Sequence, residues 1–518
     1  MQVRRKQPSR ALPFRFVLFG LMGLIVVIYV LSFASVISIS NSNSNSKLKL
    51  KLNLNPSRQE GPASGFVSNS VRRRDDSLEE DHHDRVAVER LGGNPQDHER
   101  APVAVEDHPS DADIAKAAAA RVASMRQDSG KRKNNNSDSD SDSDRDVATI
   151  GFAVTITGCG SDPITEGAAV LKHSIHLASI HGPLGGRYDY KMYAIYHPQG
   201  RACAETLTAL GYTLVERETP VAVKDIQGDF LRSKIEKNGC CGEKELVKLE
   251  AYTLTDHPIV VHLDLDTLVL QPMDSLFDWM MVGNKARDFD ASGIELQWPE
   301  AEIPETINAI FTRDFNMCRP QKKIKPVQGG FLVLRPSMDV YKEFVEIIRE
   351  GHFTEGGGWG GETGVFYGSM TFQGIIPYYY DLLHPGEHVE ANHCVYNQMA
   401  DNPRNKRTVN DVVSGLCMTG ADDCEDCRSR PLEEVITTHF TLCQKPWLCL
   451  PQDDDVIQQR LCRKLHHEWH RIRSDLEQSW GRPELGEGTY QQEHFYGHCH
   501  RHGKKGYINI KEPFGVAA

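Results

Sequence analysis

The stretch IVVHLDLDTLVLQPMDSLF, residues 259–277, decides the fold of this chain. It opens with the β-branched, apolar run that is typical of a buried parallel strand. Asp264 and Asp266 follow at the end of that strand, where open α/β sheets bind their ligands. Residues two apart in an extended segment point the same way, so both carboxylates are predicted to face one cation that bridges a diphosphate.

An Asp-x-Asp pair is a weak signal by itself, because such pairs are more often solvated carboxylates in a turn. The neighbouring residues make a metal site more favourable than a solvated turn. Leu265 and residues 268–270 keep the surroundings apolar, so two charges there lose hydration unless a cation or hydrogen bonds compensate. The sequence therefore favours a metal site over a solvated turn.

Strands and helices alternate on both sides of this stretch. The predicted strands are 148–157, 190–196, 212–215 and 327–334. The predicted helices are 167–179, 205–210, 243–255 and 338–349. Because strands that alternate with helices form parallel sheets with right-handed crossovers, the sequence predicts an α/β fold.

Polar and glycine-rich segments follow the acidic pair. Gly329 and Gly330 lie in the strand 327–334, where glycine lets a ligand approach the backbone, although a plain turn or bulge is the alternative. The glycine-dense loop GGGWGGETG, residues 356–364, carries one carboxylate, Glu362. Further along the chain, His439 stands six residues before Lys445.

Taken in order, these segments resemble those of family 8 glycosyltransferases, the glycogenin and galactinol synthase group. The resemblance covers about residues 153–447, and its most specific pieces are VTIT (154–157), KLEAY (248–252), HLDLDTLV (262–269), QGG (328–330), GETG (361–364) and HFTLCQKPW (439–447). It implies a GT-A, Rossmann-like nucleotide-diphospho-sugar transferase fold. It also implies transfer of a hexosyl group from a nucleotide sugar, UDP-hexose above all, with retention of configuration.

Carried over residue by residue, the resemblance implies a set of site residues. Mn²⁺, or Mg²⁺ in its place, would be bound by Asp264, Asp266 and His439. The donor diphosphate would be held by Lys445, and the nucleotide would lie against Thr155, Thr157, Gly329 and Gly330. The donor sugar would face the catalytic candidates Lys248, Gln328 and Glu362. The chain departs from the family at Glu362-Thr363, where Asp-Gln is usual, and at Leu442, where glycine is usual, so the sugar and part of the phosphate loop stay open.

The residue types suit this chemistry without the resemblance. A leaving diphosphate gains negative charge, which a divalent cation and a lysine stabilise as it develops. Carboxylates with one imidazole favour Mn²⁺ or Mg²⁺ over metals that select thiolates. The alternatives are a structural histidine at position 439, a solvated lysine at position 445, and a catalytically inactive nucleotide-sugar-binding or scaffold protein on the same fold.

The first 146 residues predict three regions. Residues 1–15 form a basic cytoplasmic tail, and residues 16–39 form an apolar signal anchor, long enough for a membrane helix of ~20 residues. A cleaved signal peptide is the alternative for this apolar segment. Residues 40–146 have no hydrophobic period and are expected to be a disordered stem. This organisation predicts a single-pass type II protein of the Golgi or ER membrane, with its catalytic domain in the lumen.

The catalytic domain is predicted over residues 147–450, and a helical, Cys- and His-rich extension over residues 451–518. In the extension, residues 456–480 have helical spacing, and the histidine cluster at 494–502 is either a metal site or a surface segment with Cys499 in a disulfide. Thirteen cysteines, all at or after Cys159, favour an oxidising compartment and several disulfides. Cys424 and Cys427 are either half of a zinc site or members of disulfides.

The charge of the chain bears on its partners. A formal net charge of -12, without a compact basic stripe, argues against a nucleic acid as the main partner. The predicted partners are a nucleotide-sugar donor, an acceptor that is a glycan, a glycoprotein or a small molecule, and a membrane through residues 16–39.

Overall fold

The computed structural model describes residues 147–160, 163–283, 293–318, 326–404, 415–482, 495, 497–499 and 506–510. The tail, signal anchor and stem predicted for residues 1–146 lie outside the described residues, as does most of the histidine cluster at 494–502. Among the described helices, none combines the length and the apolar character that a membrane span needs.

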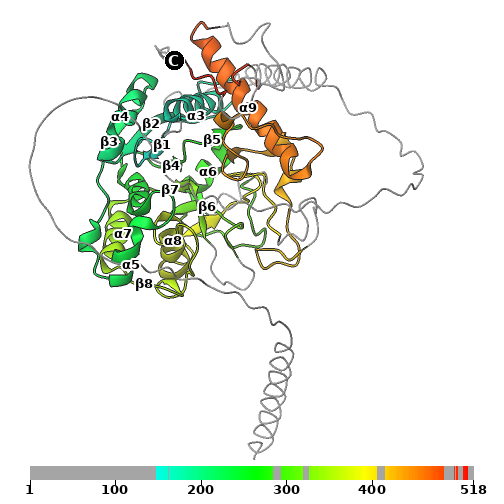
Figure 1. Cartoon of the computed structure of the whole chain (residues 1–518). Helices are drawn as coiled ribbons and strands as arrows, with labels where there is room; N and C mark the ends of the chain where they lie inside the picture. Colours follow the sequence, from blue (N-terminus) through cyan, green and yellow to red (C-terminus); the bar gives the residue numbers. More distant parts are fainter. Residues whose placement is uncertain are drawn as a thin grey trace, which may run out of the picture. The chain divides into compact units, whose positions relative to one another are not determined.

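A seven-stranded sheet forms the centre of the described part, in the order β10-β6-β7-β4-β1-β2-β3 (Figure 1). Two small two-stranded sheets, β11-β5 and β8-β9, accompany it. The strands are β1 (Thr149–Ile156), β2 (Asp189–Tyr196), β3 (Thr213–Glu216), β4 (Val260–Leu263), β5 (Thr267–Val269), β6 (Ala309–Arg313), β7 (Val327–Leu334), β8 (Phe353–Thr354), β9 (Gly358–Trp359), β10 (His388–Glu390) and β11 (Thr437–His439).

The α/β class is confirmed, but the prediction of a parallel sheet is wrong at β7, the one strand of the described seven-stranded sheet that runs opposite to the others. β1 runs parallel to β2 and to β4, whereas β7 runs antiparallel to both of its neighbours, β4 and β6. Residues 314–326 join β6 to β7, and their described part contains no helix. A connection without a crossover helix suits antiparallel neighbours, since parallel pairs need a long crossover.

Each predicted helical segment is helical in the structure, but two of them, 205–210 and 243–255, are mainly 3-10 helix, and three of the α-helices were not predicted. The α-helices are α3 (Ile164–Ala178), α4 (Arg201–Thr206), α5 (Asp229–Lys234), α6 (Asp274–Val282), α7 (Met338–Glu350), α8 (Phe372–Pro377) and α9 (Ile457–Ser479). The segment predicted as a helix at 243–255 is the 3-10 helix η5 (Gly242–Thr253). Short 3-10 segments and one π-helical segment lie at η1 (Pro198–Gly200), η2 (Leu207–Leu210), η3 (Val223–Asp225), η4 (Ile235–Lys237), η7 (Tyr378–Leu383), η8 (Cys427–Ser429), η9 (Leu432–Glu434) and η10 (Pro446–Leu448).

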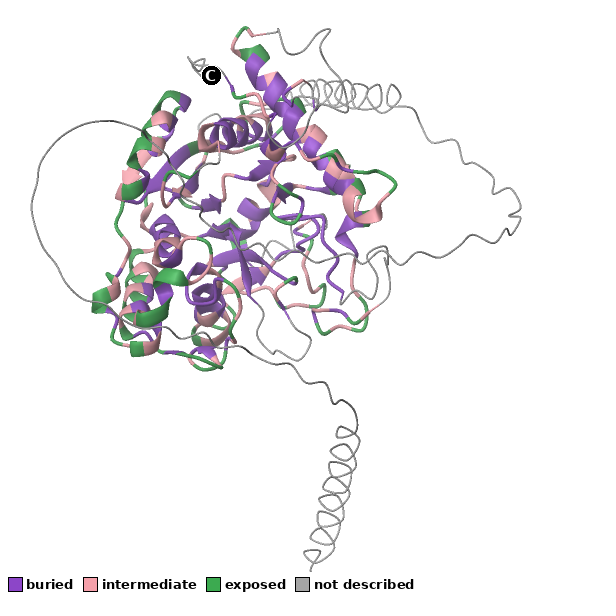
Figure 2. Ribbon diagram, in the orientation of Figure 1, coloured by how far each residue is buried: buried purple, intermediate pink, exposed green. Residues whose placement is uncertain are grey.

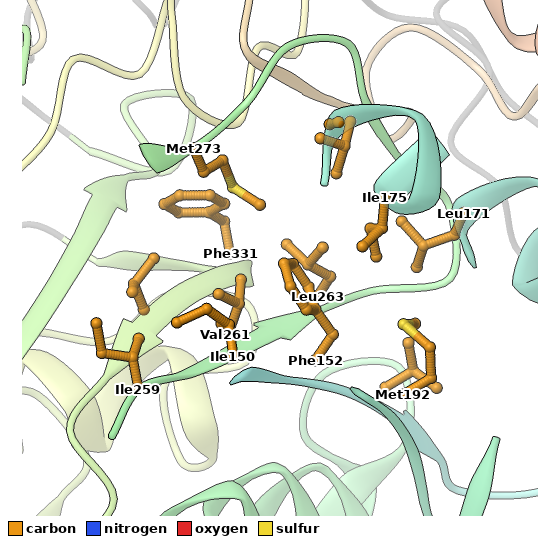
Figure 3. Close-up of a cluster of buried hydrophobic side chains, with 14 of the residues drawn as sticks. Ile150, Phe152, Leu171, Ile175, Met192, Ile259, Val261, Leu263, Met273 and Phe331 are labelled. Atoms are coloured by element: carbon orange, nitrogen blue, oxygen red, sulfur yellow. The ribbon is translucent and has the colours of Figure 1, made fainter. Parts of the chain in front are cut away.

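The two faces of the large sheet carry separate apolar cores. Along β1, Ile150, Phe152 and Val154 belong to the core that α3 and α6 cover, and Ala153 belongs to the core that η5, α7 and α8 cover. This division follows from the alternation of side chains along a strand. Figure 3 shows the first core, where side chains from β1, β4 and β7 meet α3. The strands β1, β4, β6 and β7 in the middle of the sheet are buried almost throughout, as Figure 2 shows.

The strand order reverses at β1. From β1 the chain proceeds outward through β2 to β3, and then returns to place β4 on the other side of β1. In open α/β sheets the crevice at such a reversal, beyond the carboxyl ends of the strands, is where ligands bind. Thr157 follows β1 and Asp264 follows β4, so both lie at this position.

Disulfides link segments throughout the described domain and tie the extension to it. Five pairs form, Cys159–Cys203, Cys394–Cys427, Cys417–Cys424, Cys443–Cys462 and Cys449–Cys499. The prediction of several disulfides, including one at Cys499, is confirmed. Because Cys424 and Cys427 are bonded to different partners, the alternative that they form half of a zinc site is wrong.

A buried histidine of α9 makes the stability of the chain sensitive to acid. His466 is fully buried, and its Nε2 lies 2.6 Å from the carbonyl oxygen of Gln444. Burial lowers the pKa of His466 from 6.5 to about 4. The unfolded chain binds a proton at this histidine near pH 6.5, whereas the folded chain binds it only near pH 4. The free energy of unfolding is therefore highest above pH 6.5 and decreases as the pH falls from 6.5 to about 4.

We expect His466→Gln to reduce the dependence of the free energy of unfolding on pH between neutral and acidic conditions. The pKa shift of His466 corresponds to about 3 kcal/mol at 1.36 kcal/mol per pKa unit. Urea unfolding at neutral pH and near about pH 5 measures the loss in the parent and in the variant. The exposed histidine variant His352→Gln is the control and should keep the parent's slope. Equal slopes in all three proteins would contradict the assignment to His466.

Candidate active site

The two carboxylates of the acidic pair lie in the turn that ends β4. β4 stops at Leu263, and the backbone N–H of Thr267 donates to the carbonyl of Asp264 at 3.1 Å. The expectation that both residues share one face of an extended strand is therefore wrong. The chain turns because β5 leaves the large sheet and pairs with β11, and this turn aims both carboxylates at one point.

The β5–β11 pairing brings a histidine from far along the chain to the carboxylates. His439 lies opposite Thr267 in the antiparallel register, and the N–H of Phe440 donates to the carbonyl of Asp266 at 2.9 Å. The Nε2 atom of His439 lies 3.3 Å from Asp266 Oδ1 and 3.8 Å from Asp264 Oδ2. One ligand atom from each of the three residues lies within 4.8 Å of the other two.

Gly330 of β7 makes room for this histidine. A Cβ atom at position 330 would lie 2.3 Å from Cε1 of His439, closer than any side chain tolerates. The carbonyl of Gly330 also accepts the backbone N–H of Asp264 at 3.2 Å. The imidazole of His439 occupies the space that a side chain at position 330 would take, and the carboxylates of Asp264 and Asp266 both lie near its Nε2. Hard oxygens with one imidazole fit a divalent cation of the Mn²⁺ or Mg²⁺ kind.

Each carboxylate also has its own lysine. Lys248 is buried, and its Nζ donates to Asp264 Oδ1 at 2.8 Å and to the carbonyl of Gly329 at 3.2 Å. Lys445 Nζ donates to Asp266 Oδ2 at 2.8 Å and lies 5.8 Å from the centre of the Trp447 ring. The lysine at 445 is therefore part of the cluster, which argues against a solvated surface charge.

The charges in the cluster set its protonation states. Burial alone would raise the pKa of Asp264, but Lys248, followed by His439, holds it below its ordinary value. Burial opposes ionisation of Asp266 as well, and His439, followed by Lys445, lowers its pKa strongly. Burial would lower the pKa of His439, but Asp266, followed by Asp264, raises it. Two carboxylates thus stay ionised and available to a cation.

The other residues proposed for the donor lie around this cluster. Thr155 Oγ1 lies 2.9 Å from Nε2 of His262, and Thr157 is hydrogen-bonded to the thiol of Cys241. Gln328 is buried, and its Oε1 accepts the N–H of Gly330 at 2.6 Å, so its side chain supports the backbone of β7. The structure does not give Gln328 a contact with either lysine among the described residues.

Glu362 is the one proposed residue that the structure leaves apart. Its side chain is exposed in the turn after β9, and in the part of the chain that is described no hydrogen bond or ion pair joins it to Asp264, Asp266 or His439. The neighbouring Thr363 is buried, and its Oγ1 accepts the N–H of Trp359 at 2.8 Å. Thr363 therefore holds the loop itself, and the role of Glu362 stays a prediction.

Three residues that the sequence analysis did not propose also line the cluster. His262 is fully buried, and burial, with Lys248 as a lesser cause, lowers its pKa to about 3. Glu245 Oε2 lies 3.2 Å from Lys248 Nζ. Gln373, at the start of α8, lies against Gly329, since a Cβ there would be 3.1 Å from Gln373 Cγ. The available signal was a lone polar residue within the apolar run TFQGII, residues 371–376.

Comparisons with known proteins return glycosyltransferases of similar structure. No protein family profile matches the chain, and no curated protein matches it in sequence. Mouse xyloside xylosyltransferase 1 has 11% identity and a TM-score of 0.31, with 56% of this chain and 97% of that chain covered. Galactosyltransferase LgtC, solved with donor and acceptor sugar analogues, has 12% identity and a TM-score of 0.32, over 62% of this chain and 95% of that chain. GlyE from Streptococcus pneumoniae TIGR4 has 12% identity and a TM-score of 0.32, over 64% of each chain.

Proposed function

We propose that this chain is a metal-dependent glycosyltransferase that moves a hexosyl group from a nucleotide sugar, first of all a UDP-hexose, to an acceptor. The observation that carries the proposal is the convergence of Asp264, Asp266 and His439 within 4.8 Å at the strand-order reversal, with a lysine on each carboxylate. A cluster of two carboxylates and an imidazole, flanked by lysines, suits a dianionic leaving group better than a neutral ligand.

Asp264, Asp266 and His439 would hold the cation, with Mn²⁺ as the first choice and Mg²⁺ as the second. When bound, such a cation stabilises the negative charge that develops on the leaving diphosphate. Lys445 is more than a third exposed at its side chain, so it can leave Asp266 and donate to a phosphate oxygen. Lys248 stays buried between Asp264 and Gly329, where it faces the sugar.

The backbone completes the donor site. Gly329 and Gly330 place their peptide groups beside the cluster, since the carbonyl of Gly329 accepts from Lys248 and the carbonyl of Gly330 accepts the N–H of Asp264, and the nucleotide would lie against this backbone. Thr155 and Thr157 would lie at the nucleotide, since they stand at the end of β1, on the other side of the reversal. Retention of configuration is part of the proposal, with attack from the face that the leaving phosphate occupies. Glu362 would act by positioning the acceptor.

We further propose that the catalytic domain lies in the lumen of the Golgi or ER, anchored by residues 16–39. Five disulfides among the described residues support an oxidising compartment. The full chain should stay with membranes after carbonate extraction. Complete release into the supernatant would contradict the anchor.

A donor panel tests the enzymatic proposal. The full chain in detergent, incubated with UDP- and GDP-sugars and Mn²⁺, should release free nucleotide from a UDP-hexose, and a chelator should abolish the release. Because transferases hydrolyse donors slowly without an acceptor, the readout needs no knowledge of the acceptor. Binding of UDP with Mn²⁺ but no turnover of any donor would favour the inactive, nucleotide-sugar-binding alternative. No binding of UDP with Mn²⁺ would contradict both.

A further inference from the structure

A second group of reactive side chains lies beside the candidate active site. Cys240 and Cys241 are neighbours in the chain, and both are free thiols. Their sulfur atoms lie 2.8 Å apart, and the Cys240 sulfur lies 3.0 Å from Oε1 of Glu245. Cys240 is exposed and Cys241 is partly exposed, so a dissolved reagent can reach both.

The two thiols are carried on a tight, well-supported turn. Gly239 and Gly242 flank the pair with φ of +68° and +62°, a conformation that favours glycine. The N–H of Gly242 donates to the carbonyl of Asn238 at 3.1 Å, and Oδ1 of Asn238 accepts the N–H of Met370 at 3.0 Å. The turn is thus fixed on both sides, and it presents the two sulfur atoms to each other.

The two cysteines are chemically unequal. The hydrogen bond with Cys240 lowers the pKa of the Cys241 thiol against the opposing effect of burial, and a hydrogen bond with Thr157 adds to the lowering. The same contact with Cys241, followed by burial and by Glu245, raises the pKa of Cys240. Since the thiolate is the attacking species, Cys241 is the first nucleophile and Cys240 the second.

We propose that Cys240 and Cys241 form a thiol-modification site, which low-molecular-weight disulfides convert into a reversible disulfide between neighbours. The Cys241 thiolate attacks one sulfur of the reagent RSSR, forms a mixed disulfide and releases RS⁻. The Cys240 thiol then loses its proton, attacks the Cys241 sulfur and displaces the second RS⁻. The protein gives up two protons and two electrons, and the reagent leaves as two RSH.

Geometry makes this bond reversible, in contrast to the other disulfides of the chain. Neighbouring Cα atoms are about 3.8 Å apart, which is below the usual span of a disulfide. The five structural disulfides have Cα–Cα distances between 4.8 and 6.0 Å. Strained and exposed disulfides are the ones that thiols reduce most readily. A mild redox buffer should therefore titrate Cys240 and Cys241 and leave the five structural pairs intact.

Glu245 connects this pair to the candidate donor site, a step that rests on the proposed function. Its Oε1 contacts Cys240, and its Oε2 lies 3.2 Å from Nζ of Lys248, which in turn donates to Asp264 at 2.8 Å. Disulfide formation removes the S–H group that donates to Glu245, so this carboxylate interacts more strongly with Lys248 and draws it away from Asp264. Loss of the charged hydrogen bond between Lys248 and Asp264 is expected to weaken binding of UDP with Mn²⁺ roughly tenfold.

Peptide mapping tests the modification site directly. Trypsin releases residues 238–244, NGCCGEK, which contain both thiols and no other cysteine. After equilibration of the native full chain with oxidised and reduced glutathione, this peptide should lose two hydrogens in proportion to the oxidant and regain them with reductant. Cys240→Ser should stop at a glutathione adduct on Cys241, and Cys241→Ser should stay largely unmodified. Stable adducts on both thiols of the parent, or protection of both thiols that a chelator removes, would overturn the proposal.

Calorimetry with UDP and Mn²⁺ on the reduced and oxidised chain tests the connection to the donor site. The expected result is weaker binding to the oxidised form of the parent than to its reduced form. Cys240→Ser, which cannot form the disulfide, should bind as the reduced parent does when a reductant keeps it free of adducts. Equal affinities of a chain that does form the disulfide would overturn the connection through Glu245. Absence of UDP binding in both forms would contradict the proposed function and leave the peptide result for the thiol pair standing.

Discussion

Replacing Asp266 with asparagine is expected to lower Mn²⁺-dependent turnover of the UDP-sugar by about a thousandfold or more. The carboxylate contacts His439 at 3.3 Å and Lys445 at 2.8 Å, and against the opposing effect of burial these two groups hold its pKa well below the ordinary value. Stabilisation of a leaving diphosphate by a metal is worth several kcal/mol, and each 1.36 kcal/mol corresponds to tenfold in rate. Release of nucleotide in single-donor assays measures the loss.

Two further measurements separate loss of the cation from loss of the fold. Mn²⁺ titration followed by electron paramagnetic resonance should show weak or no binding to Asp266→Asn, whether or not the protein turns over. In metal-free buffer the free energy of unfolding of the variant should be about 1–3 kcal/mol lower than that of the parent, because Lys445 and His439 lose a charged partner. Asp278→Asn, the same chemical change at a surface ion pair with Arg187, is the control and should keep full activity. Parental Mn²⁺ affinity in the Asp266 variant would refute the metal site.

Much of the fold could be predicted because its elements have strong periods. β7 was predicted at its observed bounds, and α7 and α9 within a residue at each end, since a buried strand and two amphipathic helices leave clear patterns. Strand direction leaves no such pattern. The antiparallel β7 has the same apolar run that a parallel strand would have, so only the three-dimensional path distinguishes a mixed sheet from a parallel one.

The residues of the candidate site could be proposed from the sequence, but their contacts could not. The resemblance proposes Asp264, Asp266 and His439 together. The β5–β11 pairing that brings them into contact involves strands of only three residues each, which are too short to leave a recognisable pattern in the sequence. The bond between Lys445 and Asp266 joins residues 179 positions apart, which no local pattern reports. The sequence therefore required a cation or hydrogen bonds to compensate the two carboxylates without indicating partners within the protein, and the structure supplies two lysines and a histidine.

Gly330→Ala is expected to have the second large effect, and it acts through shape rather than charge. A Cβ at position 330 would overlap the His439 ring, with 2.3 Å to Cε1 and 2.6 Å to Nδ1. β7 is a fully buried central strand and His439 is buried on β11, so neither can move far. Overpacking of this kind costs about 1–3 kcal/mol of stability, and it displaces the imidazole from both carboxylates. We expect loss of Mn²⁺ binding and of nearly all turnover, with a clear drop in the unfolding temperature.

The neighbouring residue supplies a matched control. In Gly329→Ala the added Cβ would meet Gln373 Cγ at 3.1 Å, so this partly exposed side chain has to shift by only a few tenths of an ångström. This variant should bind Mn²⁺ as the parent does and lose little stability, although its donor affinity should fall if the sugar lies against the backbone of β7. The contrast isolates the His439 contact, because both variants add one methyl group to the same strand. Equal Mn²⁺ affinities in the Gly329 and Gly330 variants would show that the cation does not depend on the position of His439, and the three-residue metal site would then be wrong.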